Sequence, residues 1–283
     1  MSRIAYVNGL YTRHAEACVH IEDRGYQFAD GVYEVWAVFG GRLADAEGHF
    51  IRLDRSLAEL KIPAPMSLAA LKRVLQETIR RNRVADGMVY LQITRGVARR
   101  DHAFPSPAVS PSVVITARSI DYAAAEIKAA KGVAVVTAPD IRWGRCDIKT
   151  VSLLPNVLAK QAAREQGAYE AWLVDKDGLV TEGSSTNAWI VDAQGRLRTR
   201  DTGANILRGI TRTSLMALAR ELQIQVIETP FTVEEAKSAA EAFITAASAF
   251  VTPVVSIDGA PVGNGRPGPV ALRLRELYLA QER

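Results

Sequence analysis

The chain has 283 residues, of which 48% are hydrophobic and 23% are charged. This composition is typical of a globular protein with a sizeable apolar core, and it excludes a mainly disordered chain, which would be poor in apolar residues. The net charge is +4, but acidic and basic residues are interspersed along the chain, so a nucleic-acid-binding protein is not expected.

The sequence also gives an expectation for the cellular compartment. No run of about 18 apolar residues occurs, so no membrane span is predicted. The first nine residues turn polar before the core of a signal peptide could form. Two cysteines, Cys18 and Cys146, are too few for a disulfide framework. We therefore expect a cytoplasmic protein with no membrane partner.

The first predicted elements indicate an antiparallel sheet accompanied by two helices. Asn8-Gly9, between the apolar runs 4–7 and 10–13, is typical of a β-hairpin. Ser67 is a suitable N-cap for a helix that begins at residue 68. The other predicted elements of this part are strands at 32–39, 88–94 and 112–117 and a helix over 50–60.

Residues 119–131 have small side chains and little strand character, which indicates a connector. Strands are predicted beyond it at 132–138, 171–174, 179–181, 188–191 and 241–246, with helices at 152–166, 211–222 and 269–281. The sequence thus predicts an α+β protein with an N-terminal domain of residues 1–118, an interdomain linker of 119–131 and a larger C-terminal domain of 132–283.

Three short segments carry residues suited to chemistry, and each also has an ordinary structural interpretation. Lys149 is either a nucleophilic amine or a loop lysine that reaches water. Glu182, followed by Gly183 and the small polar residues 184–187, either pairs with a protonated nitrogen or lies in a solvated turn. The helix that begins near Thr211 suits a phosphate at its N-terminus, or Thr211 simply caps it.

Taken in order, four segments resemble those of the fold-type IV pyridoxal-phosphate enzymes: RGYQFADGVYE at 24–34, DIK at 147–149, TEGSSTN at 181–187 and GITR at 209–212. That family includes branched-chain aminotransferases, aminodeoxychorismate lyases and D-amino-acid aminotransferases. The resemblance extends over nearly the whole chain. It implies pyridoxal 5'-phosphate as the cofactor and a two-domain α+β fold, with a small N-terminal α/β layer and a larger C-terminal domain built on a β-barrel-like sheet and helices.

The resemblance also implies roles for individual residues. Lys149 is expected to form the internal aldimine and to move the proton between the substrate Cα and the cofactor C4′. Glu182 is expected to face the pyridine nitrogen and keep it protonated. The other residues implied at the cofactor are Arg52, Ile210 and Thr211 at the phosphate, together with Tyr169, Ser184, Ser185, Thr186 and Leu207. No metal is expected.

Arg100 and His102 decide which member of the family the chain resembles most. In D-amino-acid aminotransferases such a pair reaches in from the partner subunit and binds the substrate carboxylate together with a tyrosine that Tyr33 matches here. Val35 is also expected to line the substrate site. The resemblance therefore implies a homodimer that transfers the amino group of D-alanine to 2-oxoglutarate, giving pyruvate and D-glutamate by a ping-pong mechanism.

Several alternatives stay open from the sequence. Within the family these are a branched-chain L-amino-acid transaminase, an (R)-amine transaminase and an aminodeoxychorismate lyase. A non-catalytic protein that only stores the cofactor is disfavoured, because the chain has both Lys149 and Glu182. Ala246 and Ala247 stand where the family commonly has phosphate-binding hydroxyls, so either Thr245 or Ser248 replaces them or the phosphate is held with one contact fewer.

Overall fold

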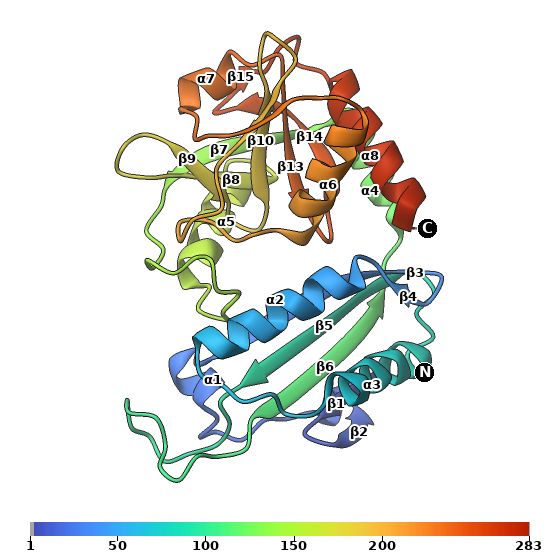
Figure 1. Cartoon of the computed structure of the whole chain (residues 1–283), viewed down its shortest axis with the longest axis vertical. Helices are drawn as coiled ribbons and strands as arrows, with labels where there is room; N and C mark the ends of the chain where they lie inside the picture. The colour runs from blue at the N-terminus through green and yellow to red at the C-terminus, as the bar shows by residue number, and fades with distance from the viewer. Residues whose placement is uncertain (1–2, 283) are drawn as a thin grey trace. The chain divides into compact units, whose positions relative to one another are not determined.

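The computed structural model describes residues 3–282 of the chain (Figure 1). These residues form two compact units. The first unit comprises residues 3–122 and 148–152, and the second comprises 123–147 and 153–282. Each unit combines helices with a largely antiparallel sheet, which confirms the predicted α+β class.

The first unit is built on a six-stranded antiparallel sheet with the strand order β2-β1-β6-β5-β3-β4. The hairpin predicted around Asn8-Gly9 is present, because Val7 pairs with Leu10 across the turn. The strands are β1 (Ile4–Val7), β2 (Leu10–Arg13), β3 (Gly31–Phe39), β4 (Arg42–Leu43), β5 (Gly87–Thr94) and β6 (Ser112–Ser119).

Helices α2 (Ala46–Glu59) and α3 (Leu68–Arg81) cover one face of this sheet (Figure 1). Both present an apolar stripe to the strands, and the core between them includes the fully buried Trp36 and Leu75. Ser67 caps α3 as predicted, since its hydroxyl accepts a hydrogen bond from the Ala70 amide at 3.3 Å. The short helices η1 (His14–Glu16) and α1 (Arg24–Phe28) precede β3.

Alternation along β3 sends its side chains to opposite faces of the sheet. Glu34 and Trp36 are buried, whereas Tyr33 and Val35 are only half-buried. The segment 148–152 runs along β3, because the Tyr33 amide donates to the Lys149 carbonyl at 3.0 Å. This pairing brings Lys149 beside Tyr33.

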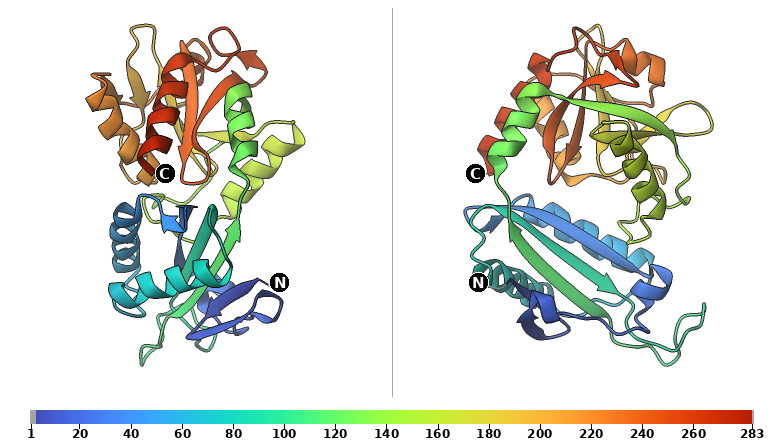
Figure 2. Two further views of the ribbon diagram at one scale, coloured as in Figure 1. Left: turned by 90° about the vertical axis from the view of Figure 1, so that its right-hand side faces the viewer. Right: turned by 180° about the vertical axis from the view of Figure 1, so that it is seen from behind.

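The second unit is built on a nine-stranded mixed sheet with the strand order β12-β11-β10-β13-β14-β7-β8-β9, and β15 pairs with β14. Its strands curl rather than lie flat (Figure 2). They are β7 (Val133–Pro139), β8 (Glu170–Val174), β9 (Val180–Gly183), β10 (Asn187–Val191), β11 (Leu197–Thr199), β12 (Val226–Glu228), β13 (Glu241–Ala246), β14 (Phe250–Ile257) and β15 (Ala260–Pro261). The later helices of the chain are α4 (Tyr122–Lys131), α5 (Leu154–Glu165), α6 (Ile210–Glu221), α7 (Val233–Lys237) and α8 (Pro269–Glu282).

Several of these elements were not predicted. Most of the segment expected to be a connector forms α4, whose alanine-rich sequence favours a helix. The strands β11, β12 and β14 and the short α7 were also missed. Within residues 3–282, none of the helices combines the length and the apolar character needed to cross a membrane.

Candidate active site

Lys149 lies against an aromatic face of the first unit. Its Nζ is 4.1 Å from the centroid of the Tyr33 ring, and the Tyr33 ring is 5.8 Å from that of Tyr90. Burial and the neighbouring Tyr33 raise the pKa of Tyr90 to about 12, so this phenol stays protonated at neutral pH. Val35 lies on the same face of β3 as Tyr33. The structure therefore brings together Lys149, Tyr33 and Val35, three of the predicted site residues.

Arg52, predicted at the phosphate, is held by a buried carboxylate. Its Nε and Nη2 each donate to Glu34 at 2.8 Å, and His49 Nδ1 donates to the same carboxylate at 2.6 Å. Burial would raise the pKa of Glu34, but the charge of Arg52 and the hydrogen bonds from Arg52 and His49 lower it to about 2. Arg52 thus sits in a fixed position on α2, and its contact with a phosphate stays a prediction.

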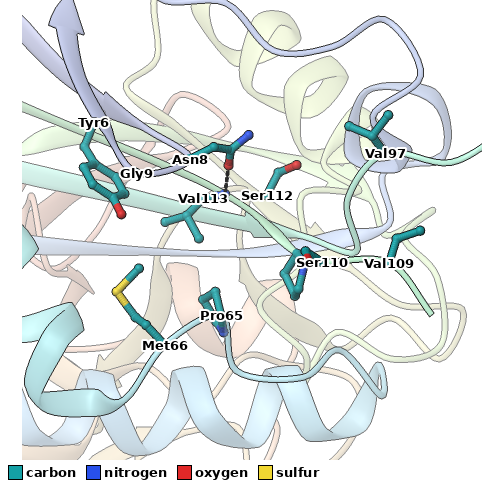
Figure 3. Close-up of a pocket in the computed structure, with 11 residues that line it drawn as sticks. Tyr6, Asn8, Gly9, Pro65, Met66, Val97, Val109, Ser110, Ser112 and Val113 are labelled. Carbon is teal, nitrogen blue, oxygen red and sulfur yellow. Dashed lines mark hydrogen bonds between the residues drawn. The ribbon is translucent and has the colours of Figure 1, made fainter.

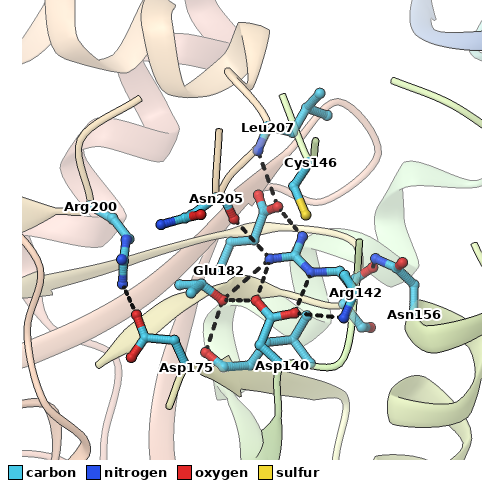
Figure 4. Close-up of polar contacts among 12 residues, drawn as sticks. Asp140, Arg142, Cys146, Asn156, Asp175, Glu182, Arg200, Asn205 and Leu207 are labelled. Carbon is cyan, nitrogen blue, oxygen red and sulfur yellow. Dashed lines mark hydrogen bonds and ion pairs between the residues drawn. The ribbon is translucent and has the colours of Figure 1, made fainter. Parts of the chain in front are cut away.

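Glu182 is buried in the second unit at the centre of a polar network (Figure 4). One carboxylate oxygen accepts from Arg142 Nη1 and from the Leu207 amide, the latter at 3.1 Å. Arg142 is shared with Asp140, which its Nε and Nη2 contact at 2.9 and 2.7 Å. Burial raises the pKa of the Glu182 carboxyl despite Arg142, so a further cation beside this carboxylate would be favourable.

Asn187 connects Glu182 to the start of α6. Its Nδ2 donates to Glu182 Oε2 at 2.9 Å and to the Leu207 carbonyl at 3.0 Å. Its Oδ1 packs so closely on Gly209 that a Cβ at that position would lie 2.0 Å away. A larger residue at 209, where α6 begins, would therefore have to displace the Asn187 side chain from its contacts with Glu182 and Leu207.

The N-terminus of α6 has donors suited to an anion. Gly209 is the N-cap and gives no side-chain cap, so the Thr211 hydroxyl does not cap the helix, contrary to one of the two interpretations of the sequence. Thr211 is buried, and its Oγ1 has no hydrogen-bond partner within the described chain. The first amides of the helix also lack intrahelical partners. An unpaired buried hydroxyl beside free amides fits the phosphate of the expected cofactor.

The hydroxyls of Ser184, Ser185 and Thr186, expected at the cofactor, instead donate to a buried carboxylate. Glu170 accepts all three, Ser185 at 2.8 Å and Thr186 at 3.3 Å, and also the Ala171 amide at 2.9 Å. Glu170 thus fixes the turn between β9 and β10. A contact of these three residues with the cofactor stays a prediction.

Two other candidates also have protein partners. The Tyr169 ring lies under the ammonium groups of Lys128 and Lys160, at 4.2 and 4.5 Å from the ring centroid. Thr245 Oγ1 accepts a hydrogen bond from the Trp189 indole at 3.0 Å, and Ser248 is exposed in a turn. The proposed cofactor roles of these residues stay predictions.

Arg100 and His102 both lie exposed on the loop that joins β5 to β6. Neither side chain forms an ion pair with another described residue. A cavity of about 460 Å3 lies at another part of the first unit, beside the β1–β2 turn (Figure 3). It contains none of the predicted site residues and is lined by Tyr6, Asn8, Gly9, Pro65, Met66, Val97, Val109, Ser110, Pro111, Ser112 and Val113.

Comparison with known proteins decides the family. Residues 31–257 match the sequence profile described as "Amino-transferase class IV". The chain belongs to the class IV aminotransferase family.

This aminotransferase has close relatives among curated sequences. It is 43% identical over 263 residues to a D-alanine aminotransferase of Bacillus licheniformis, covering 93% of this chain and 91% of the relative. It is 40% identical over 271 residues to a D-alanine aminotransferase of Staphylococcus haemolyticus, covering 96% and 95%.

Solved structures confirm the predicted fold-type IV architecture. The T.th. branched-chain amino acid aminotransferase with pyridoxamine 5'-phosphate has a TM-score of 0.89 at 28% identity, covering 99% of this chain and 93% of that one. The branched-chain amino acid aminotransferase from Escherichia coli has a TM-score of 0.88 at 26% identity, covering 100% and 95%.

Sequence reasoning missed several residues of this aminotransferase that hold the predicted ones. They are Glu34 and His49 around Arg52, Arg142 and Asn187 around Glu182, and Glu170 under the turn 184–186. Three of them, Glu34, Asn187 and Glu170, lie inside segments quoted for the resemblance or directly beside a candidate residue. The signal that could have found them is a charged or amide side chain within an otherwise buried strand or helix, since such a group needs a partner.

Proposed function

We propose that this chain transfers the amino group of a D-amino acid such as D-alanine to 2-oxoglutarate, giving pyruvate and D-glutamate, with pyridoxal 5'-phosphate as its cofactor. The observation that carries the proposal is the identity of 43% and 40% to two D-alanine aminotransferases over more than nine-tenths of the chain. Identity to the branched-chain enzymes of the same fold is 28% and 26%. A D-amino-acid substrate is therefore favoured over a branched-chain L-amino acid.

The cofactor would be held at both ends by residues of this chain. The Thr211 hydroxyl and the first amides of α6 would bind the phosphate, with Arg52 as a further cation. Glu182 would hold a proton on the pyridine nitrogen, because a buried carboxylate with a raised pKa gains from a neighbouring cation. When bound, the cofactor supplies the electron sink for the charge left on the substrate Cα.

Lys149 would be the catalytic base. Its amine has no carboxylate partner among the described residues and lies against the Tyr33 ring rather than in an ion pair. In this role Lys149 would take the proton from the substrate Cα and deliver it to C4′ of the bound cofactor. Because one pocket would accept the donor and then the acceptor, with the amino group retained on the cofactor between them, the reaction would be ping-pong.

The substrate would be oriented by side chains that bind its α-carboxylate, here called the carboxylate grip. Arg100 and His102, with the Tyr33 hydroxyl, would bind the α-carboxylate, and Val35 would contact the remainder of the substrate. We propose that the enzyme is a homodimer in which the loop carrying Arg100 serves the partner's site. The exposure of Arg100 and His102 on this loop, with no ion pair to another described residue, supports the proposal.

The remaining expectations complete the proposal. We propose residues 1–118 and 132–283 as the N-terminal and cofactor-binding domains and 119–131 as their linker. The division of the chain into two compact units after residue 122 supports two domains, and it differs from these bounds in assigning residues 148–152 to the first unit. A cytoplasmic location is supported by the two cysteines, both of which are free thiols.

The test is the visible absorption of the purified protein with its cofactor, mixed separately with D-alanine and with L-leucine. D-alanine should bleach the cofactor band and release pyruvate, and L-leucine should not. Bleaching by L-leucine alone would refute the D-specific proposal. Lys149→Ala should abolish turnover, whereas Lys176→Ala, at an exposed lysine in a turn, should leave it unchanged.

A further inference from the structure

Phe28, the last residue of α1, contacts two of the three side chains proposed to bind the substrate carboxylate, Arg100 and His102. The Arg100 guanidinium carbon is 4.7 Å from the centroid of the Phe28 ring, within the range of a cation–π interaction. The His102 ring is 5.4 Å from the Phe28 ring, centroid to centroid, at an interplanar angle of 50°. Two side chains that are exposed to solvent therefore share one half-buried aromatic surface.

Arg24, which like Phe28 belongs to the short helix α1, holds the backbone of the loop that carries Arg100 and His102. Arg24 Nη1 donates to the carbonyls of Asp101 and Ala103 at 2.6 and 3.2 Å, and Nη2 donates to that of His102 at 3.4 Å. Arg24 is 3% exposed, and its Nε pairs with Asp30 at 2.8 Å. The charge of the buried guanidinium is thus balanced while its remaining donors hold the loop.

Asp30 also anchors the start of this loop. Arg95 Nε and Nη2 contact the two oxygens of Asp30 at 2.7 and 2.9 Å, and the Phe104 ring covers the Arg95 guanidinium at 3.6 Å. Burial opposes ionisation of Asp30, but the hydrogen bonds and charges of the two arginines lower its pKa, so the pairing persists at neutral pH. With the loop backbone held, the chief remaining freedom of Arg100 and His102 is in their side-chain rotamers.

We propose that Phe28 is a positioning residue that holds Arg100 and His102 ready for the substrate carboxylate; this rests on the function proposed above. A long exposed side chain loses rotamer freedom when it binds a ligand, and contact with a ring that is already in place lowers that cost. Phe28 does not touch the substrate in this scheme. Its effect reaches the substrate through Arg100 and His102, and its ring also lies 4.9 Å from the guanidinium carbon of Arg24, which holds the loop backbone.

A positioning role for Phe28 predicts kinetic constants that differ from those expected if Phe28 only stabilised the fold. D-Alanine and 2-oxoglutarate share the α-carboxylate and differ in their side chains. Loosening the grip should raise KM for both substrates by a similar factor and leave kcat nearly unchanged. Inhibition by acetate, which has a carboxylate and no amino group, should weaken by the same factor.

The experiment compares the wild-type holoenzyme with Phe28→Leu, Phe28→Tyr and Tyr26→Leu. Loss of the ring should raise both KM values and the acetate inhibition constant roughly three- to tenfold, a range set by contacts of this kind. Phe28→Tyr retains the ring and should behave as wild type. Tyr26, 75% exposed on the same helix, is the matched control, and Tyr26→Leu should change none of these values.

Three outcomes would overturn the proposal. Unchanged KM values in Phe28→Leu, at an unchanged melting temperature, overturn the role of Phe28 while wild-type turnover still supports the function. An equal effect of Tyr26→Leu also overturns it, because the cause would then be the helix as a whole. If Phe28→Leu is insoluble, Phe28→Met takes its place in the same comparison. A wild-type enzyme that does not convert D-alanine refutes the proposed function and this proposal together.

Discussion

Replacing Thr211 by valine should affect the cofactor-free protein and cofactor binding in opposite directions. The Thr211 hydroxyl is buried at the start of α6 and has no partner in the part of the chain that the structure describes. Valine has nearly the same shape and no hydroxyl, so it removes an unpaired polar group from the interior. In the loaded enzyme the same change removes a donor to the phosphate.

The magnitudes follow from the environment of this hydroxyl. A buried, unsatisfied polar group costs about 1–3 kcal/mol, so the free energy of unfolding of the cofactor-free variant should be equal to that of wild type or higher by ~1 kcal/mol. A hydrogen bond to a charged oxygen contributes about 1.5–3 kcal/mol. Losing it should weaken cofactor affinity roughly 10- to 150-fold.

Two measurements check this prediction. Urea unfolding of the cofactor-free proteins gives the stability difference, and titration with pyridoxal 5'-phosphate gives the dissociation constant. Thr213→Val is the control, because Thr213 lies exposed on the same helix and its hydroxyl bonds only to the Gly209 carbonyl at 3.1 Å. The reasoning is refuted if Thr211→Val destabilises the cofactor-free protein or leaves cofactor affinity unchanged.

Three further predictions concern buried ionisable groups. The pKa of Glu34 is lowered from 4.5 to about 2, so the pairing of its carboxylate with Arg52 and His49 stabilises the fold fully above pH 4.5. About 3 kcal/mol of the free energy of unfolding should be lost as the pH falls from 4.5 toward 2, and urea unfolding at each pH should show no such loss in Glu34→Gln. Glu170→Gln should lower the free energy of unfolding by about 1–3 kcal/mol, because an amide cannot accept from all the hydroxyls of the turn that Glu170 holds, and an unchanged urea midpoint would contradict that role. Burial raises the pKa of the Cys146 thiol to about 11, so iodoacetamide at pH 8 should alkylate the exposed Cys18 well before Cys146. Equal labelling of the two cysteines would show that the pKa of Cys146 is not raised.

Local signals in the sequence were enough to predict much of the fold. The turn at Asn8-Gly9 and the cap at Ser67 are each specified within a few residues, and both are confirmed. Strands β11 and β12 have three residues each, too few for a periodic pattern, and neither was predicted. The alanine-rich α4 has few side chains that show which face is buried.

The contacts around the site depend on tertiary structure and could not be read in the same way. Glu34 meets Arg52 only because α2 packs on the face of β3 to which Glu34 points. Glu170 reaches the hydroxyls of residues 184–186 only because β8 pairs with β9. The sequence indicated candidate residues for the chemistry, but the partners that hold them come from strands and helices brought together by folding.

The position of Asn187 has a consequence for how the enzyme can change. The Asn187 amide side chain contacts Glu182, which is proposed to face the cofactor ring. It also contacts the Leu207 carbonyl and Gly209 at the start of α6, where the phosphate is proposed to bind. If the two proposed roles hold, a change that alters the electronics of the cofactor ring would also alter the binding of its phosphate, because Asn187 contacts both places. Variants of this enzyme with altered chemistry should acquire substitutions at the two ends in concert rather than one at a time.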